Sequence, residues 1–288
     1  MSALLCVRLT MNGYPDDIIL YPGEVSKRRE IAAAVAAAYR ELAHVCGIFS
    51  WGSTAAGDAD SSSDVDIGVY LSGPIPSREA RRLAARALAD DPAAMSFGGL
   101  TGLEGCEKFW VSGVPVFVGW WSLEKDRRFL ERKLRSLPKT LDDAKAENEL
   151  GEVQRTLLLW DPQGFQADLK RIVGSWFETK GKEELVSKRL TRAEYEITNH
   201  LPRALERGDA VWAEESRRNA LNELIRIVYY LNNRFLRRLK SVDLELQAFR
   251  IKPSDFVSRI RRAAISGPRA ALPILTDLLA DVRILSAG

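Results

Sequence analysis

The chain has 288 residues, of which 46% are hydrophobic and 28% are charged, and its formal net charge is +3. This is a globular composition with room for one large domain or two ordinary ones, and the mild charge does not favour nucleic acid as a partner. Two histidines and three cysteines without metal-ligand spacing do not favour a zinc centre or a Ser-His-Asp triad; the cysteines indicate a reducing, cytoplasmic compartment, and no apolar run has the length of a membrane helix.

The first 121 residues alternate between helical and strand patterns. Apolar residues spaced along one helix face, short apolar runs typical of buried strands, and breaks at glycine and proline mark the elements. We predict a helix, two strands, a second helix and up to three further strands, over residues 24–45, 48–51, 64–71, 78–89, 93–97, 108–112 and 114–121. This is an α/β unit with a small mixed sheet, which we assign to a first domain of residues 1–121.

From residue 122 onward, strand patterns nearly vanish and helical periodicity continues to the C-terminus. Proline and glycine divide this part into predicted helices over residues 123–137, 141–159, 164–178, 182–207, 210–240, 242–249, 253–265 and 269–285. We therefore expect an all-α second domain, a helical bundle of residues 122–288.

Residues suited to phosphate chemistry gather around the first two predicted strands. Gly52 and Ser53 end the first strand, where glycine lets the backbone approach a ligand closely and backbone groups could hold phosphates. Asp64 and Asp66 begin the second strand, and because they are two residues apart they point to the same face. Neighbouring carboxylates repel each other, and a divalent cation such as magnesium relieves that repulsion. The pattern predicts a device for phosphoryl or nucleotidyl transfer.

The ordered combination of Gly52-Ser53, a ten-residue connection and Ser63-Asp64-Val65-Asp66 resembles the signature of the polymerase-β-type nucleotidyltransferase superfamily. Residues 159–164 and 231–235 resemble the helical region that follows the core in bacterial members, such as the antibiotic nucleotidyltransferases. The resemblance implies that Asp64 and Asp66 are catalytic and bind magnesium. It also implies that Gly52, Ser53 and Ser63 bind a nucleoside triphosphate, and that a nucleoside monophosphate, AMP from ATP, passes to a hydroxyl group.

One residue of the superfamily pattern is missing. A third acidic residue usually stands on a later strand, and the matching position here is Phe117, in a stretch without acids from 112 to 122. Three explanations stay open: another carboxylate takes the role, two carboxylates suffice for one magnesium ion, or the protein is a catalytically impaired nucleotide-binding or protein-interaction module. The carboxylates considered for the role are Glu104, Glu107, Asp142, Asp143, Glu147 and Glu149.

The acceptor hydroxyl is left open between a small molecule and a protein. Tryptophans near the predicted core strands could stack on a substrate or pack between the domains, namely Trp51, Trp110, Trp120 and Trp121. Basic residues of the helical region that could reach the phosphates are Arg217, Arg218, Arg226 and Lys240. The basic stretch 234–240 has the spacing of an ordinary amphipathic helix face.

Overall fold

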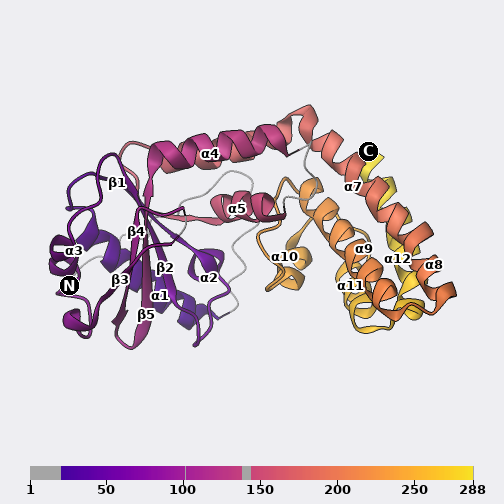
Figure 1. Cartoon of the computed structure of the whole chain (residues 1–288), viewed down its shortest axis with the longest axis horizontal. Coiled ribbons are helices and arrows are strands. Elements are labelled where there is room, and N and C mark those ends of the chain that lie inside the picture. The colour runs from indigo at the N-terminus through magenta and orange to yellow at the C-terminus, as the bar shows by residue number, and fades with distance from the viewer. Residues whose placement is uncertain (1–20, 101, 138–143, 288) are drawn as a thin grey trace.

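The computed structural model describes residues 21–100, 102–137 and 144–287. It contains a six-stranded mixed sheet, on the left in Figure 1, with the strand order β3-β4-β5-β2-β1-β6. β2 and β5 run parallel, and the other neighbouring strands run antiparallel. The strands are β1 Val45–Trp51, β2 Val65–Leu71, β3 Ser96–Gly98, β4 Gly105–Val111, β5 Val114–Ser122 and β6 Leu157–Trp160.

One face of the sheet packs against α1 (Pro22–Tyr39) and α3 (Arg78–Ala85). Alternate residues of the two central strands, such as Ile67 and Val69 of β2 and Trp120 of β5, are fully buried on this face. The Trp120 ring meets Tyr39 of α1, with 5.7 Å between ring centroids. This alternation is the period of two that a strand presents to a core.

The opposite face of the sheet turns toward the C-terminal helices. Phe49 of β1 and Tyr70 of β2 are buried there in one cluster with Leu130 of the helix α4 (Leu123–Ser136). Gly68 lies beneath the Phe49 ring, because a Cβ atom at Gly68 would stand 2.1 Å from the ring's Cζ. This face also carries Asp66, and it is the one on which the candidate site is built.

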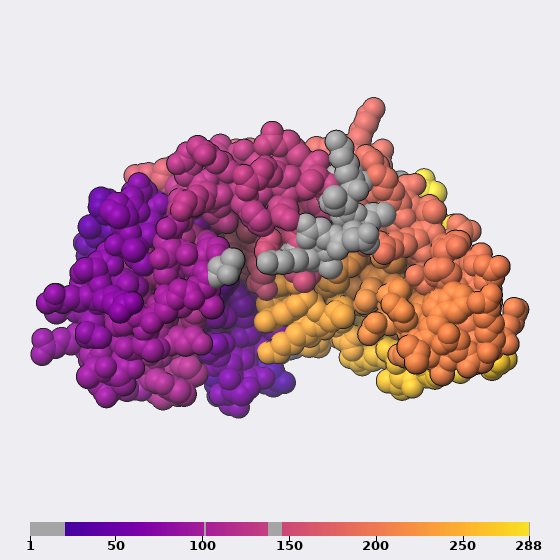
Figure 2. Space-filling view, in the orientation of Figure 1, coloured from indigo at the N-terminus to yellow at the C-terminus, as the bar shows by residue number. Residues whose placement is uncertain are grey.

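Helices make up most of the remaining chain. In Figure 1, α4 extends from the sheet to α7, and α5 lies between the sheet and the C-terminal bundle, in which α9 packs on α7 and α12. Figure 2 shows the surface indented where the N-terminal region, indigo to purple, meets the orange C-terminal segment. These helices are α2 Gly52–Ala56, α4 Leu123–Ser136, α5 Ala144–Arg155, α6 Phe165–Ser175, α7 Lys180–Tyr195, α8 Leu201–Arg207, α9 Ala210–Leu231, α10 Val242–Ala248, α11 Phe256–Ile265 and α12 Pro268–Ala287.

The C-terminal region is mostly helical but not all-α, which corrects the sequence prediction. The helix expected over 141–159 ends at Arg155, and Leu157–Trp160 forms the strand β6 beside β1. Four consecutive apolar residues fit a buried strand as well as a helix, and their pairing with β1 satisfies backbone groups that a free sheet edge would leave open. Because β6 comes from beyond residue 121 and joins the sheet, the division into two domains at that residue stays a prediction.

Other predicted helices differ in their ends or continuity, and three of these differences are large. The first stops at Tyr39 rather than at residue 45, and the one over 182–207 contains a π-helical turn at Glu196–His200. The helix over 210–240 stops at Leu231, and Asn233 then takes a positive φ of 56°. Residues 232–240 therefore form an irregular segment, and the amphipathic helix face predicted for 234–240 is wrong.

No helix within the described ranges combines the length and the apolar character needed to span a bilayer.

Candidate active site

The corner between β1 and α2 brings a glycine and a carboxylate into contact. Gly52 opens α2 directly after β1 and has a φ of +64°, a conformation that glycine adopts without strain. Antiparallel pairing places Trp51 opposite Asp66 of β2. A Cβ atom at Gly52 would stand only 2.3 Å from Asp66 Oδ2. A glycine is therefore needed here for both its backbone conformation and its missing side chain.

The two predicted aspartates lie together at the start of β2. Asp64 is exposed just before the strand, and Asp66 is half-buried within it. Burial, and then the negative charge of Asp64, raise the pKa of Asp66 to about 7, while Trp51 and Arg238 act against that rise. A site that raises a carboxyl pKa in this way gains from a bound cation, which relieves both causes.

A carboxylate that the sequence prediction did not include, Glu152 of α5, completes this cluster. Its carboxylate accepts a hydrogen bond from the Gly52 backbone, and its negative charge contributes to the raised pKa of Asp66. Burial raises the pKa of Glu152 itself, against the opposing charges of Arg237 and Arg238. One oxygen, Oε2, is buried without a hydrogen-bond partner, so one acceptor of Glu152 is unused within the described residues.

Two arginines of the irregular segment 232–240 reach the same cluster. Arg237 is 2% exposed, with Nη2 3.3 Å from Asp58 Oδ2 and Nη1 3.8 Å from Glu152 Oε1. Arg238 acts on Asp66 and Glu152 by its charge, and its Nε and Nη2 are buried without hydrogen-bond partners. Residues 232–240 are not helical, and this irregular backbone lets the neighbouring Arg237 and Arg238 side chains both reach the carboxylates.

The two predicted phosphate-binding serines are both buried in the connection between β1 and β2, Ser53 within α2 and Ser63 just before Asp64. The Ser53 carbonyl accepts the backbone N–H groups of Gly57 and Asp58, which turns the chain after α2. The Ser63 hydroxyl is engaged with Asp60, at 3.0 Å from its Oδ1, and Arg28 Nε donates to the Ser63 carbonyl over 2.8 Å. Both serines thus shape the loop, and phosphate binding by Gly52, Ser53 and Ser63 stays a prediction.

Phe117 stands where the sequence analysis placed it. It pairs with Asp66 in the parallel register of β2 and β5, and its ring stacks on Trp51 with centroids 6.3 Å apart. A carboxylate at this position would lie on the strand beside Asp66. The structure has an aromatic ring there, and the carboxylate that approaches Asp66 comes from α5 instead.

Two of the candidate substitutes for the missing acid lie near β4, and neither joins Asp66. Glu104 pairs with Lys125, whose Nζ is 2.7 Å from Glu104 Oε1. Glu107 lies on the opposite face of the sheet, where it is buried and paired with Arg81 and accepts the Trp120 Nε1–H over 2.9 Å. Glu107 therefore belongs to the core beneath α1 and α3.

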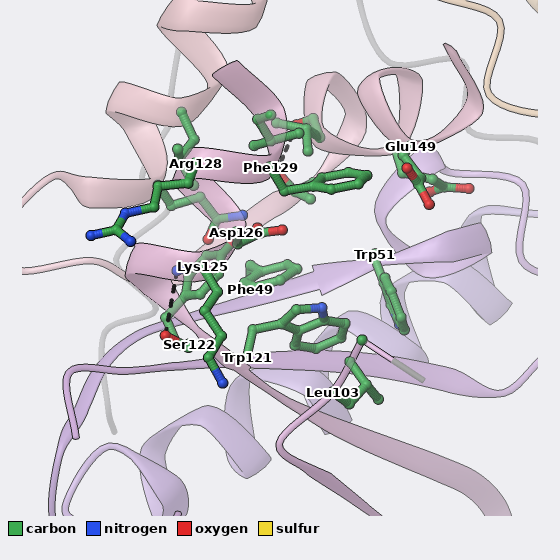
Figure 3. Close-up of a pocket in the computed structure, with 18 of the residues that line it drawn as sticks. Phe49, Trp51, Leu103, Trp121, Ser122, Lys125, Asp126, Arg128, Phe129 and Glu149 are labelled. Atoms are coloured by element: carbon green, nitrogen blue, oxygen red, sulfur yellow. Dashed lines mark hydrogen bonds between the residues drawn. The ribbon is translucent and has the colours of Figure 1, made fainter. Parts of the chain in front are cut away.

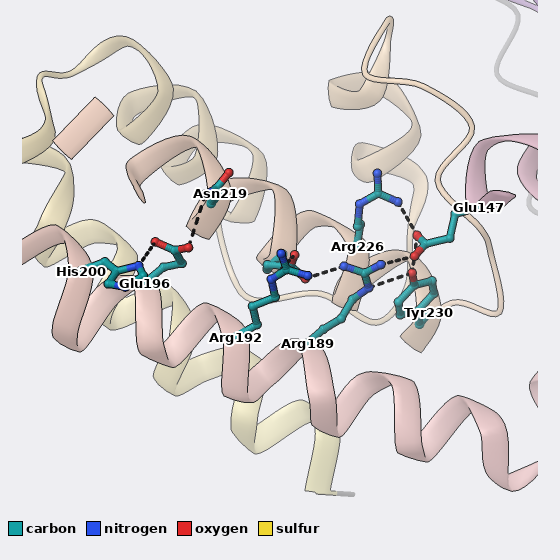
Figure 4. Close-up of polar contacts among 9 residues, drawn as sticks. Glu147, Arg189, Arg192, Glu196, His200, Asn219, Arg226 and Tyr230 are labelled. Atoms are coloured by element: carbon teal, nitrogen blue, oxygen red, sulfur yellow. Dashed lines mark hydrogen bonds and ion pairs between the residues drawn. The ribbon is translucent and has the colours of Figure 1, made fainter. Parts of the chain in front are cut away.

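The candidates around α5 also separate from the cluster. Glu147 is fully buried and bound by Arg189, Arg226 and Tyr230 (Figure 4). Glu149 lines a cavity described below (Figure 3), while Asp142 and Asp143 lie outside the described residues.

The structure gives partners to several of the basic residues that the sequence analysis named. Arg226 is held by Glu147, and Arg217 binds Glu214 and the carbonyls of Ala263 and Ala264, so both serve the packing of the helices. Lys240 lies close enough to Asp60 for its charge to help lower the pKa of that carboxyl to about 2, mainly a result of hydrogen bonds from Ser62 and Ser63.

A cavity of about 800 Å³, which we call the aromatic pocket, opens beside the carboxylates (Figure 3). Its walls come from the sheet and from α4, α5 and α6, and Trp51 and Glu152 line it at the end next to Asp66. Five aromatic side chains take part in the lining, namely Phe49, Trp51, Tyr70, Trp121 and Phe129.

The donor set of the cluster fits magnesium rather than a fully protein-bound metal. Within the described residues, no group of three or more His, Cys, Asp or Glu side chains is placed to hold a metal ion. Magnesium, however, is usually bound by one or two carboxylates together with waters and substrate phosphates. Asp64 and Asp66 supply two such carboxylates, and the pKa of Asp66 is raised by burial and then by the charge of Asp64.

Comparisons with known proteins add little to this picture. No protein-family profile and no curated protein matches the sequence. A solved structure described as a nucleotidyltransferase-like protein from Exiguobacterium sibiricum aligns over 90% of this chain and 74% of that chain, with 11% sequence identity and a TM-score of 0.41. A TM-score this low establishes neither a shared fold nor an activity, so the function proposed below rests on the residues of the site.

Proposed function

We propose that the protein is a polymerase-β-type nucleotidyltransferase that moves a nucleoside monophosphate, AMP from ATP, to a hydroxyl acceptor. One observation carries the proposal: Asp66, half-buried beside Asp64, is joined at the Gly52 corner by Glu152 from a distant helix. Three carboxylates, the buried Arg237 and the half-buried Arg238 gather around a backbone turn, a set suited to a polyphosphate with a cation. Glu152 Oε2 has no hydrogen-bond partner in the described structure, so this acceptor is available to the proposed chemistry.

Asp64 and Asp66 are the residues that would hold magnesium. When bound there, the ion would neutralise the charge that develops on the triphosphate during transfer. Arg238 has two guanidinium nitrogens without hydrogen-bond partners, Nε and Nη2, which are suited to phosphate oxygens. The Gly52 corner lets the triphosphate approach the backbone without meeting a side chain.

Glu152 is placed to act as the general base in place of an acid at Phe117. In the proposed step, the acceptor oxygen attacks the α-phosphorus, the bond from that phosphorus to the pyrophosphate oxygen breaks, and the acceptor proton passes to Glu152. Burial raises the pKa of Glu152, which makes it a better proton acceptor than an ordinary glutamate. Such a base contributes about 10² to 10⁴ in rate.

A second candidate function is a nucleotide-binding module without turnover. It is favoured by Phe117, which occupies the strand position beside Asp66 where the superfamily usually places its third acid. In this case, nucleotide would bind but no pyrophosphate would be released with any acceptor.

The first experiment is calorimetric titration with ATP, GTP, CTP and UTP, each with and without magnesium, on wild type and on Asp66→Asn. We expect magnesium-dependent binding in wild type and its loss in the variant, while Asp168→Asn, an exposed aspartate paired with Arg171, serves as the matched control. Screening hydroxyl-bearing acceptors for pyrophosphate release then separates the two candidate functions. If no nucleotide binds to wild type with magnesium, both are wrong.

A further inference from the structure

The far end of the aromatic pocket contains an acidic group that the proposed chemistry does not use. Asp126 of α4 is mostly enclosed, and the Tyr70 hydroxyl donates to its Oδ2 over 2.5 Å. Burial raises the pKa of Asp126, and the Tyr70 hydrogen bond opposes that rise. Within the described residues, no lysine, arginine or histidine forms an ion pair with this carboxylate.

A row of aromatic rings leads from Asp126 to the candidate active site. Tyr70 contacts Phe49 with 5.0 Å between ring centroids, Phe49 contacts Trp121 at 5.6 Å, and Trp121 meets Trp51 edge-on at 4.8 Å. All four rings come from β1, β2 and β5 and line the pocket (Figure 3). A ligand lying along this row would have one end at Asp126 and the other beside Glu152.

The positive charges of the pocket lie at its rim. Lys125, Arg128 and Arg132 are exposed, and the first two pair with Glu104 and Glu124. Figure 3 shows Arg128 pointing away from the aromatic rings, whereas Asp126 lies between Phe129 and Phe49. The pocket interior therefore combines carboxylates with aromatic faces.

This combination is suited to an organic cation. An enclosed carboxylate without a cationic partner is costly, and a ligand ammonium would supply that partner. The faces of tryptophan, tyrosine and phenylalanine rings attract a cation as well, most strongly where water is excluded. A cavity of about 800 Å³ has the size of a site for a drug-sized molecule.

We propose that the aromatic pocket binds the acceptor, a small molecule with a protonated amine on an apolar or aromatic body, its ammonium at Asp126 and its hydroxyl beside Glu152. The assignment of this molecule as acceptor rests on the proposed function, because only nucleotidyl transfer gives the hydroxyl a role. Recognition of the ammonium rests on the pocket alone. The two parts can therefore be tested separately.

The test uses two probes of nearly equal size, 2-phenylethylamine and 2-phenylethanol, with no nucleotide and no magnesium present. Binding to the full chain is followed by saturation-transfer NMR and by the fluorescence of the tryptophans that line the pocket. We expect the amine to bind more tightly than the alcohol, and Asp126→Asn to weaken the amine about tenfold to a hundredfold, as for a hydrogen bond to a charged group. The same variant should leave the alcohol unchanged, and Asp168→Asn should change neither.

Equal binding of amine and alcohol, no binding of the amine, or amine binding unaffected by Asp126→Asn would overturn the inference. If circular dichroism shows that Asp126→Asn does not fold, Phe129→Leu replaces it, since it keeps the carboxylate and removes one ring face, and amine binding should again weaken more than alcohol binding. If the protein binds the amine but no nucleotide, the ammonium site is supported and the proposed function is contradicted. If the protein binds nucleotide with magnesium but does not bind the amine, the proposed function is supported and the ammonium site is contradicted.

Discussion

Glu147 and Glu152 lie five residues apart on the same helix, yet their surroundings differ in a way that separates structure from function. Five helical residues turn by about 140°, so the two side chains face nearly opposite directions. Glu147 turns into the C-terminal bundle, where Arg189, Arg226 and Tyr230 use both of its oxygens (Figure 4). Glu152 turns toward the sheet and keeps Oε2 without a partner beside Asp66.

The two glutamates differ in how fully their oxygens are paired and in the sign of the charges around them. A buried charge with every oxygen paired contributes to the stability of its surroundings, and removing it leaves its partners uncompensated. A buried charge with an open oxygen, close to other carboxylates, lowers stability and is retained for another reason. Variants of the two glutamates should therefore affect different properties, which the following predictions test in order of expected size.

The largest effect is expected for Glu152→Gln. Loss of the proton acceptor should lower single-turnover pyrophosphate release about 10²- to 10⁴-fold. The free energy of unfolding should hold or rise, because glutamine accepts the Gly52 hydrogen bond without carrying a buried charge. Rapid-quench kinetics and urea denaturation measure the two quantities. An unchanged rate in a folded variant would remove Glu152 from the mechanism, and Glu184→Gln, on the exposed surface of α7, is the control.

The converse is expected for Glu147→Ala. Removing this carboxylate leaves Arg189, which is 2% exposed, without its closest partner, and should lower the free energy of unfolding by about 3–5 kcal/mol. Chemical denaturation followed by circular dichroism measures the loss. Glu184→Ala breaks an exposed pair with Lys188 and should cost at most about 1 kcal/mol. Equal losses in the two variants would contradict the structural role of Glu147.

Gly52→Ala tests the corner that brings Asp66 and Glu152 together. A residue with a side chain at a φ of +64° costs about 1–2 kcal/mol, and the new Cβ atom would collide with Asp66 Oδ2 at 2.3 Å. We expect this loss of stability and, in addition, loss of magnesium-dependent nucleotide binding. Gly208→Ala has a similar φ of +71° with open space around the position, so it should lose stability without losing binding. Parallel thermal melts and titrations compare the two.

The smallest effect is a pH dependence of stability from Asp126. Burial raises the pKa of Asp126 in the folded state. The contribution of Asp126 to the free energy of unfolding is therefore most favourable below the pKa that this residue has in the unfolded chain. It is lost as the pH rises through the pKa that Asp126 has in the folded state. Asp126→Asn should therefore gain stability relative to wild type as the pH rises from the acid range toward neutrality. Urea unfolding across that range gives the difference, and a constant difference at every pH would show that Asp126 has an ordinary pKa.

Local pattern was sufficient for the carboxylate pair and for much of the sheet. Asp64 and Asp66 could be placed together because a strand has a period of two. Phe117 was singled out by the resemblance to the superfamily, and the structure shows that it pairs with Asp66 in parallel register. The carboxylate pair and most of the strands depend on residues within short stretches of clear pattern, so they could be predicted from the sequence.

What only the tertiary structure decided is how distant segments close on that pair. Glu152 carries no signal that separates it from Glu147 or Glu149 on the same helix, because its role depends on the face of α5 that docks on the sheet. Arg237 and Arg238 reach the site because α9 ends at Leu231, and Asp126 matters only where α4 covers the aromatic rings. Periodicity determines which residues share a face, whereas the packing of helix on sheet determines what that face meets.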